Sequence, residues 1–162
     1  MVICIVREDL IRDASELPVW VPTYCAYSTH ANNGSMYNTP NCWSIYITKL
    51  VLEWIQNEMG GLAAMKTYNE KKAGLLYSFL DQSKLFRGTV VKEDRSLMNI
   101  PFVTGSDELD AKFVKESTAA GFVNLKGHRS VGGMRASIYN AMPSEGIDKL
   151  VDFMEKFRKA NA

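Results

Sequence analysis

The stretch GHRSVGGMRASIYNAMP, residues 127–143, is the most informative part of the sequence. Together with the lysine before it, it places four basic side chains and three glycines within ten residues. Arginine offers a planar bidentate donor to carboxylate or phosphate, histidine adds a switchable donor, and glycine lets backbone approach a ligand closely. The stretch is therefore either an anion-binding loop or a solvated basic hairpin. Its cations are Lys126, His128, Arg129 and Arg135.

The sequence on both sides of this stretch predicts an α+β domain. Short apolar runs bounded by turn residues indicate strands, and apolar residues at helical spacing indicate amphipathic helices. Strands are expected over Leu85–Val91, Met98–Val103, Phe122–Leu125 and Met134–Ala141. Helices are expected from Leu62 to about Ser83, from a cap near Ser106 to Gly121, and across Ile147–Phe157.

A second candidate anion site is GSMYNTP, residues 34–40. Thr39 and Pro40 suit the start of a helix that runs to about Glu58 and is apolar around most of its circumference, so we expect it to be largely buried. Unpaired N–H groups at a helix start favour anions, and Asn38 and Thr39 could add side-chain hydrogen bonds to a phosphate. Plain helix capping by Thr39 is the alternative.

The chain is expected to divide at Gly60-Gly61, which ends that helix. Before it, the turn-rich segment from Arg7 to Gly34 is long for a structureless loop. The run MVICIV, Met1–Val6, predicts a strand buried on both faces, which needs neighbours on both sides. Either the chain lacks what normally precedes this strand, or the domain simply opens on a core strand.

Composition limits the class of protein. Hydrophobic residues make up 46% and charged residues 23%, which is globular composition, and the net charge of +1 supplies no field that would gather nucleic acid or membrane. No segment approaches the clean apolar length of a membrane span. Three cysteines without CxxC spacing and two histidines make disulfide and metal sites poor interpretations. Unpaired thiols and the lack of a signal pattern predict a cytoplasmic protein.

The basic stretch closely resembles the C-terminal signature of the phosphoserine aminotransferase family, which are pyridoxal-phosphate enzymes. SMYNTPN (Ser35–Asn41) is similar to the family's S-[ML]-[FY]-N-T-P-P segment. LVLEWIQNEMGGLAAM (Leu50–Met65), MNIPF (Met98–Phe102) and the IVREDL start (Ile5–Leu10) follow in the family's order. Asn41 departs from the pattern, because the family has a second proline there.

The resemblance implies a fold-type I α/β aminotransferase of class V. Such enzymes have a large cofactor domain with a mostly parallel sheet and a small α+β C-terminal domain. Residues 1–59 would be the end of the large domain, with its last strand and a helix, and residues 60–162 the small domain. The family works as homodimers with active sites at the interface. It transfers an amino group from glutamate to 3-phosphohydroxypyruvate, giving phosphoserine and 2-oxoglutarate in serine biosynthesis.

The resemblance also implies a role for each residue of this chain that matches a family motif. Asn38 and Thr39 match the pair that reaches the cofactor phosphate of the other subunit. Arg135 matches the arginine that pairs with the substrate α-carboxylate, and His128 and Arg129 match the pair that holds the distal phosphate or carboxylate. Because both substrates are dianionic, one arginine fixes the reacting end and the other cations accept the far end.

The catalytic group of the family has no counterpart in the chain. The family's Schiff-base lysine would precede Met1, and no lysine here matches it, so the chain alone is expected to be inactive and to retain the cofactor poorly. Two interpretations remain open. The chain is a piece of a working aminotransferase, or it is a non-catalytic anion-binding or dimerisation module derived from that fold.

Overall fold

The computed structural model describes residues 1–161. The chain divides into two compact units, Met1–Trp54 and Ile55–Ala162, which are described separately below. The dividing point lies a few residues before the predicted one at Gly60-Gly61. The assignment of residues 1–59 and 60–162 to two domains of the parent fold stays a prediction.

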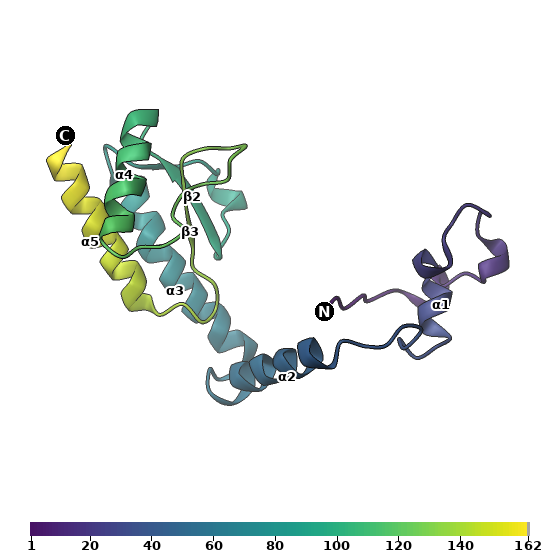
Figure 1. Ribbon diagram of the computed structural model, residues 1–162. Coiled ribbons are helices and arrows are strands. Elements are labelled where there is room, and N and C mark those ends of the chain that lie inside the picture. Colours follow the sequence, from purple (N-terminus) through teal and green to yellow (C-terminus); the bar gives the residue numbers. More distant parts are fainter. Residues whose placement is uncertain (162) are drawn as a thin grey trace. The chain divides into compact units, whose positions relative to one another are not determined.

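Up to residue 41, the first unit consists of short helical turns joined by irregular chain (Figure 1). The predicted strand at Met1–Val6 is wrong for this structure, because no strand forms there and Val2 and Ile5 are 86% and 96% exposed. A strand needs a hydrogen-bonded neighbour, and none is present among the described residues. The turns are the 3₁₀ helices η1 (Glu8–Leu10), η2 (Ala14–Glu16) and η3 (Thr23–Cys25), followed by α1 (Tyr27–Ala31).

The helix α2 (Cys42–Asn57) begins two residues later than predicted. Its N-cap is Asn41, whose Oδ1 accepts a hydrogen bond of 3.0 Å from Ser44 N, so Thr39 does not cap the helix. The expected burial of α2 is also wrong: Trp43 is 71% exposed and Leu52 is 55% exposed. No helix within residues 1–161 is long and apolar enough to cross a membrane.

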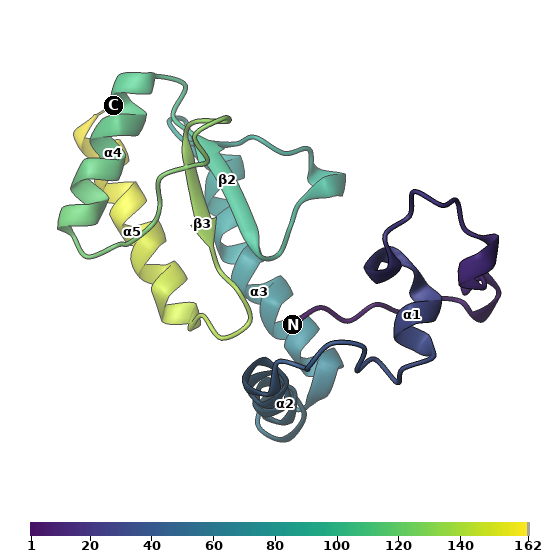
Figure 2. The ribbon, with the colours of Figure 1, turned by 45° about the vertical axis from the view of Figure 1, so that its right-hand side comes forward.

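The second unit is a three-stranded antiparallel sheet with helices on one face (Figure 2). The strand order is β1 (Arg87–Gly88), β2 (Asn99–Val103) and β3 (Met134–Ser137). Side chains alternate along β2: Ile100 and Phe102 are buried against the helices, while Pro101 faces the open side. The covering helices are α3 (Gly61–Gln82), α4 (Asp107–Ala119) and α5 (Ser144–Ala160); the short turn η4 (Lys92–Asp94) precedes β2.

The helices of this unit confirm the predictions, and the strands do so only in part. Ser106 caps α4 as expected, since its Oγ accepts from Leu109 N. The first and last predicted strands shorten to β1 and β3. Phe122–Leu125 is not a strand, because the left-handed φ of 60° at Asn124 breaks the extended backbone, and pairing with β3 is limited to Leu125 and Lys126.

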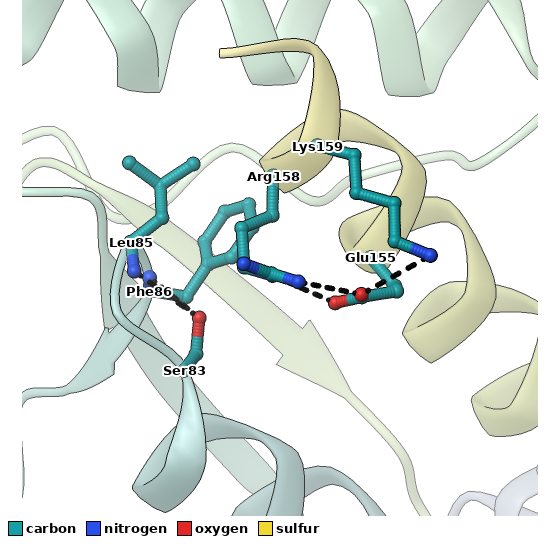
Figure 3. A network of polar contacts seen from close by, with 6 residues as sticks. All are labelled: Ser83, Leu85, Phe86, Glu155, Arg158 and Lys159. Atoms are coloured by element: carbon teal, nitrogen blue, oxygen red, sulfur yellow. Dashed lines mark hydrogen bonds and ion pairs between the residues drawn. The ribbon is translucent and has the colours of Figure 1, made fainter. Parts of the chain in front are cut away.

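The C-terminal turns of α5 carry an ion pair between Glu155 and Arg158 (Figure 3). Arg158 donates to both carboxylate oxygens of Glu155, at 2.8 and 2.7 Å, and Lys159 Nζ lies 3.5 Å from the same carboxylate. Nearby, Ser83 N donates to Phe79 O at the end of α3, and Ser83 Oγ accepts from Phe86 N at 3.0 Å in the turn that follows. The hydrogen bonds from Arg158 lower the pKa of Glu155 to about 2, against an ordinary value of 4.5.

This pKa gives the Glu155–Arg158 pair a defined pH dependence. A carboxylate whose pKa is lower in the folded state stabilises the fold above its unfolded pKa and loses that contribution as pH falls. We expect the stability difference between wild type and Glu155→Gln to be constant at neutral pH and to shrink between about pH 4.5 and pH 2. Urea unfolding across this range measures it, and a difference that does not change with pH would contradict the assignment.

Candidate functional site

The basic stretch forms a tight loop that leads into β3. Gly127 N donates to Gly133 O at 2.8 Å, and Arg135 N donates to Leu125 O at 2.8 Å, so the two sides of the loop pair at its base. At its tip, the N–H groups of Val131 and Gly132 both donate to His128 O, at 2.9 and 2.8 Å. The backbone therefore holds His128 and Arg129 at the turn and Arg135 on the strand.

Two glycines make this closure possible. A Cβ on Gly127 would lie 2.1 Å from Gly132 O, and one on Gly133 would lie 2.9 Å from Phe102 O. Gly133 also has a left-handed φ of 61°. Because the obstructing atoms belong to the backbone, a side chain at either position forces the loop itself to move.

Gly127→Ala is accordingly expected to open the base of the loop and to destabilise the second unit by about 1–3 kcal/mol, the usual range for overpacking. Gly132→Ala is the matched comparison, because its Cβ would meet nothing within 4 Å and the cost is only that of a left-handed φ of 73°. Urea unfolding and the hydrogen exchange of Gly127 N measure the two effects. Equal, small effects of both substitutions would contradict the proposed closure.

His128 is held in one tautomer by its neighbour. Ser130 N lies 3.3 Å from His128 Nδ1, and Ser130 Oγ lies 2.7 Å from it. A backbone N–H can only donate, so Nδ1 carries the lone pair and Nε2 carries the proton in the neutral ring. The exposed imidazole thus presents an N–H donor to solvent, beside the exposed guanidinium of Arg129.

Arg135 carries an unused donor. It lies opposite Pro101 in the β2–β3 register, on the face of the sheet that the helices leave open, and its side chain is half-buried. Its Nε is buried and has no hydrogen-bond partner. A buried charged donor without an acceptor is costly, so this position favours an acceptor that arrives from outside, and a carboxylate matches the guanidinium fork.

The electrostatics of the loop favour an anion as well. Among residues 1–161, the ion pairs involve other cations, such as Arg95 with Asp81 and Arg158 with Glu155. None of the four basic side chains of the loop pairs with a carboxylate in that part of the chain. Their charge is therefore not neutralised by a neighbouring carboxylate, and four such cations within ten residues can attract an anion.

Asn38 and Thr39 lie in the first unit, in the exposed loop before α2. Neither side chain has a hydrogen bond within the described residues, and Asn41 caps the helix in place of Thr39. Their amide and hydroxyl groups therefore remain free to donate to phosphate oxygens, beside the backbone N–H groups of Cys42 and Trp43 at the start of α2. An amide and a hydroxyl beside a helix start are suited to a phosphate group. They belong to a different unit from the basic loop.

Lys72 was not expected from the sequence to be buried. It is 1% exposed, and Nζ donates to the carbonyl oxygens of Tyr139 and Met142 at 2.8 and 3.0 Å. Burial lowers the pKa of its ammonium group, which is a common sign of a reactive lysine. Here Nζ is instead engaged with backbone and anchors the chain that follows β3. Its place on the buried stripe of α3, between Asn69 and Leu76, was the available signal.

The comparisons with known proteins identify the class. The family model described as aminotransferase class-V matches residues 14–150, and the chain belongs to this family. Its relatives include phosphoserine aminotransferase from Streptococcus suis, 54% identical over 161 residues, and that of Listeria innocua, 54% identical over 160 residues. Each match covers 99% of this chain but 43% of the relative, so the chain spans less than half the length of these enzymes.

Solved structures of phosphoserine aminotransferases are similar to this chain as well. Phosphoserine aminotransferase from Bacillus circulans subsp. alkalophilus superposes with a TM-score of 0.87 at 50% identity, over 97% of this chain and 43% of that one. A pyridoxal-phosphate-bound phosphoserine aminotransferase from Trichomonas vaginalis gives a TM-score of 0.79 at 40% identity, over 86% of this chain and 40% of that one. The α+β unit is thus part of a fold-type I aminotransferase fold.

Proposed function

We propose that this chain forms part of a phosphoserine aminotransferase. The enzyme would transfer an amino group from glutamate to 3-phosphohydroxypyruvate, giving phosphoserine and 2-oxoglutarate for serine biosynthesis. The observation that carries the proposal is the basic loop before β3, with a buried Arg135 Nε that lacks an acceptor and with cations that no carboxylate neutralises within residues 1–161. The likeness to phosphoserine aminotransferases at 54% identity supports the choice of reaction.

The roles of the residues follow from the shape of the substrates. Each amino-acid or oxo-acid substrate carries one anionic group at the reacting end and another at the far end. Arg135 holds the α-carboxylate through its planar fork, which fixes the reacting carbon, and rigidity comes from the strand beneath it. His128 donates from Nε2 and Arg129 from its guanidinium to the distal phosphate or carboxylate. One loop can therefore accept both substrates in turn.

Pyridoxal phosphate, when bound, supplies the electron sink that allows the amino group to leave one carbon skeleton and join another. Asn38 and Thr39 would hold its phosphate in the other subunit of a homodimer. Apolar side chains that α2 leaves open, including Trp43 and Leu52, supply surface for such an assembly. Cys4, Cys25 and Cys42 are unpaired and exposed, which suits a reducing cytoplasm.

A hybrid enzyme tests the proposed function. The segment of the Streptococcus suis enzyme that matches this chain is replaced by the full 162-residue chain, and formation of 2-oxoglutarate from glutamate and 3-phosphohydroxypyruvate is followed. We expect the hybrid to be active. A hybrid that folds and binds pyridoxal phosphate but does not turn over 3-phosphohydroxypyruvate would contradict the proposed substrate.

The chain by itself serves as the control for that experiment. No lysine in it matches the family's cofactor-binding lysine, and Lys72 is committed to backbone carbonyls. We expect no borohydride-reducible attachment of pyridoxal phosphate to the isolated chain. A lysine-dependent, reducible absorbance would show that this chain carries its own catalytic lysine.

A further inference from the structure

His30 organises the loop that carries Asn38 and Thr39. It lies in α1, half-buried, and its Nε2 is 2.7 Å from Tyr24 O. A carbonyl oxygen can only accept, so Nε2 carries a proton and donates. This side-chain hydrogen bond ties α1 to η3, the turn that precedes it.

The imidazole ring also makes two aromatic contacts. It meets Tyr24 edge-on with ring centroids 4.9 Å apart, and it meets Tyr37 edge-on at 6.3 Å. Tyr37 directly precedes Asn38 in the chain. Edge-to-face pairs at these separations are attractive, so His30 links Tyr24 in η3 to the residue that precedes Asn38 and Thr39.

The backbone of His30 holds the same loop from its other side. His30 O accepts hydrogen bonds from Ser35 N at 2.8 Å and from Asn33 N at 3.3 Å. Ser35 has a left-handed φ of 63°, a conformation that costs a residue with a side chain about 1–2 kcal/mol and persists only where the surroundings impose it. The loop from Asn33 to Tyr37 is therefore folded around His30 instead of extending freely.

We propose that His30 is a positioning residue for the cofactor-phosphate loop. It acts through Tyr37 and the turn at Ser35, and holds Asn38 and Thr39 in the pose that meets phosphate. This inference rests on the proposed function, which gives Asn38 and Thr39 their role toward pyridoxal phosphate. His30 itself need not touch the cofactor.

Three substitutions separate the contributions of the ring and the donor. His30→Gln retains an N–H donor toward Tyr24 O but removes the ring, His30→Phe retains a ring but removes the donor, and His30→Ala removes both. Tyr27→Leu is the matched control, because Tyr27 lies on the same short helix, is 52% exposed, and has no side-chain hydrogen bond in the described chain. Circular dichroism checks that each variant is folded.

The first measurement is amide hydrogen exchange in the full chain without ligand. We expect His30→Ala to accelerate exchange of Ser35 N by about tenfold or more, as expected for the loss of roughly one hydrogen bond and one aromatic contact. His30→Phe and His30→Gln should each restore part of the protection, and Tyr27→Leu should leave it unchanged. Unchanged exchange in His30→Ala would overturn the inference.

The second measurement is the dissociation constant of pyridoxal phosphate in the hybrid enzyme, with substrate KM determined at saturating cofactor. We expect His30→Ala to weaken cofactor binding about tenfold and to leave substrate KM unchanged, a split that general destabilisation would not produce. Asn38→Ala separates the two hypotheses. If Asn38→Ala weakens cofactor binding and His30→Ala does not, the inference about His30 fails alone. If Asn38→Ala has no effect, the cofactor role of the loop fails.

Discussion

Arg135→Ala in the hybrid enzyme is expected to weaken the binding of both glutamate and 3-phosphohydroxypyruvate by about 100-fold. The side chain supplies two charge-assisted hydrogen bonds to the α-carboxylate, each worth about 1.5–3 kcal/mol, and part of that is recovered by water in the vacated position. The common α-carboxylate explains why both substrates lose affinity together. Steady-state KM values for each substrate, at saturating pyridoxal phosphate, measure the effect.

Arg135→Lys is the informative control for this prediction. It keeps the positive charge but loses the planar fork and the buried Nε, so it should recover only part of the affinity. Arg129→Ala should instead weaken the binding of the substrate's distal phosphate or carboxylate, while the α-carboxylate stays bound to Arg135. An Arg135→Ala variant with unchanged affinity for both substrates would refute the role assigned to Arg135.

Phe113→Ala is expected to have the largest effect on stability, about 3–5 kcal/mol. Phe113 is fully buried at the centre of the second unit, with ring centroids 5.1 Å from both Phe86 and Phe157. Removal of the ring leaves a cavity between β2, α4 and α5, which the rigid sheet closes only in part. Urea unfolding monitored by circular dichroism gives the free energy difference.

Val123→Ala provides the comparison for Phe113→Ala. Val123 is 76% exposed on the same unit, so its truncation should change the free energy of unfolding by less than about 0.5 kcal/mol. A loss below about 1 kcal/mol for Phe113→Ala would mean that the aromatic cluster is not the stabilising centre of this unit.

The helices were predictable because their signals are local. The apolar stripe of α3, the cap at Ser106 and the amphipathic pattern of α5 each specify a helix within their own residues. The strands were less predictable from the sequence, because a strand forms only where a neighbouring strand pairs with its backbone N–H and C=O groups. The run at Met1–Val6 has the composition of a buried strand and no neighbour among the described residues, and the left-handed Asn124 interrupts the predicted strand at Phe122–Leu125.

The residue that caps α2 was likewise not predictable from the sequence alone. Thr39 and Asn41 are both competent N-caps, and their sequence positions differ by only two residues. The three-dimensional path of the loop places the Asn41 side chain over Ser44 N, and this leaves Thr39 free. Asn41 therefore supplies a capping side chain that a proline at this position would lack.

The sequence by itself determined the chemistry this protein offers: a glycine-bearing basic loop, an Asn-Thr pair before a helix, and the family to which both belong. Residue type and spacing suffice for these, because donors, charges and glycine's freedom are properties of the residues themselves. The tertiary structure alone decided that Arg135 Nε is buried without an acceptor, that Lys72 is occupied by backbone carbonyls, and that the rings of His30 and Tyr37 meet edge-on. Burial and partnership depend on segments far apart in the chain, and only the folded backbone brings those segments together.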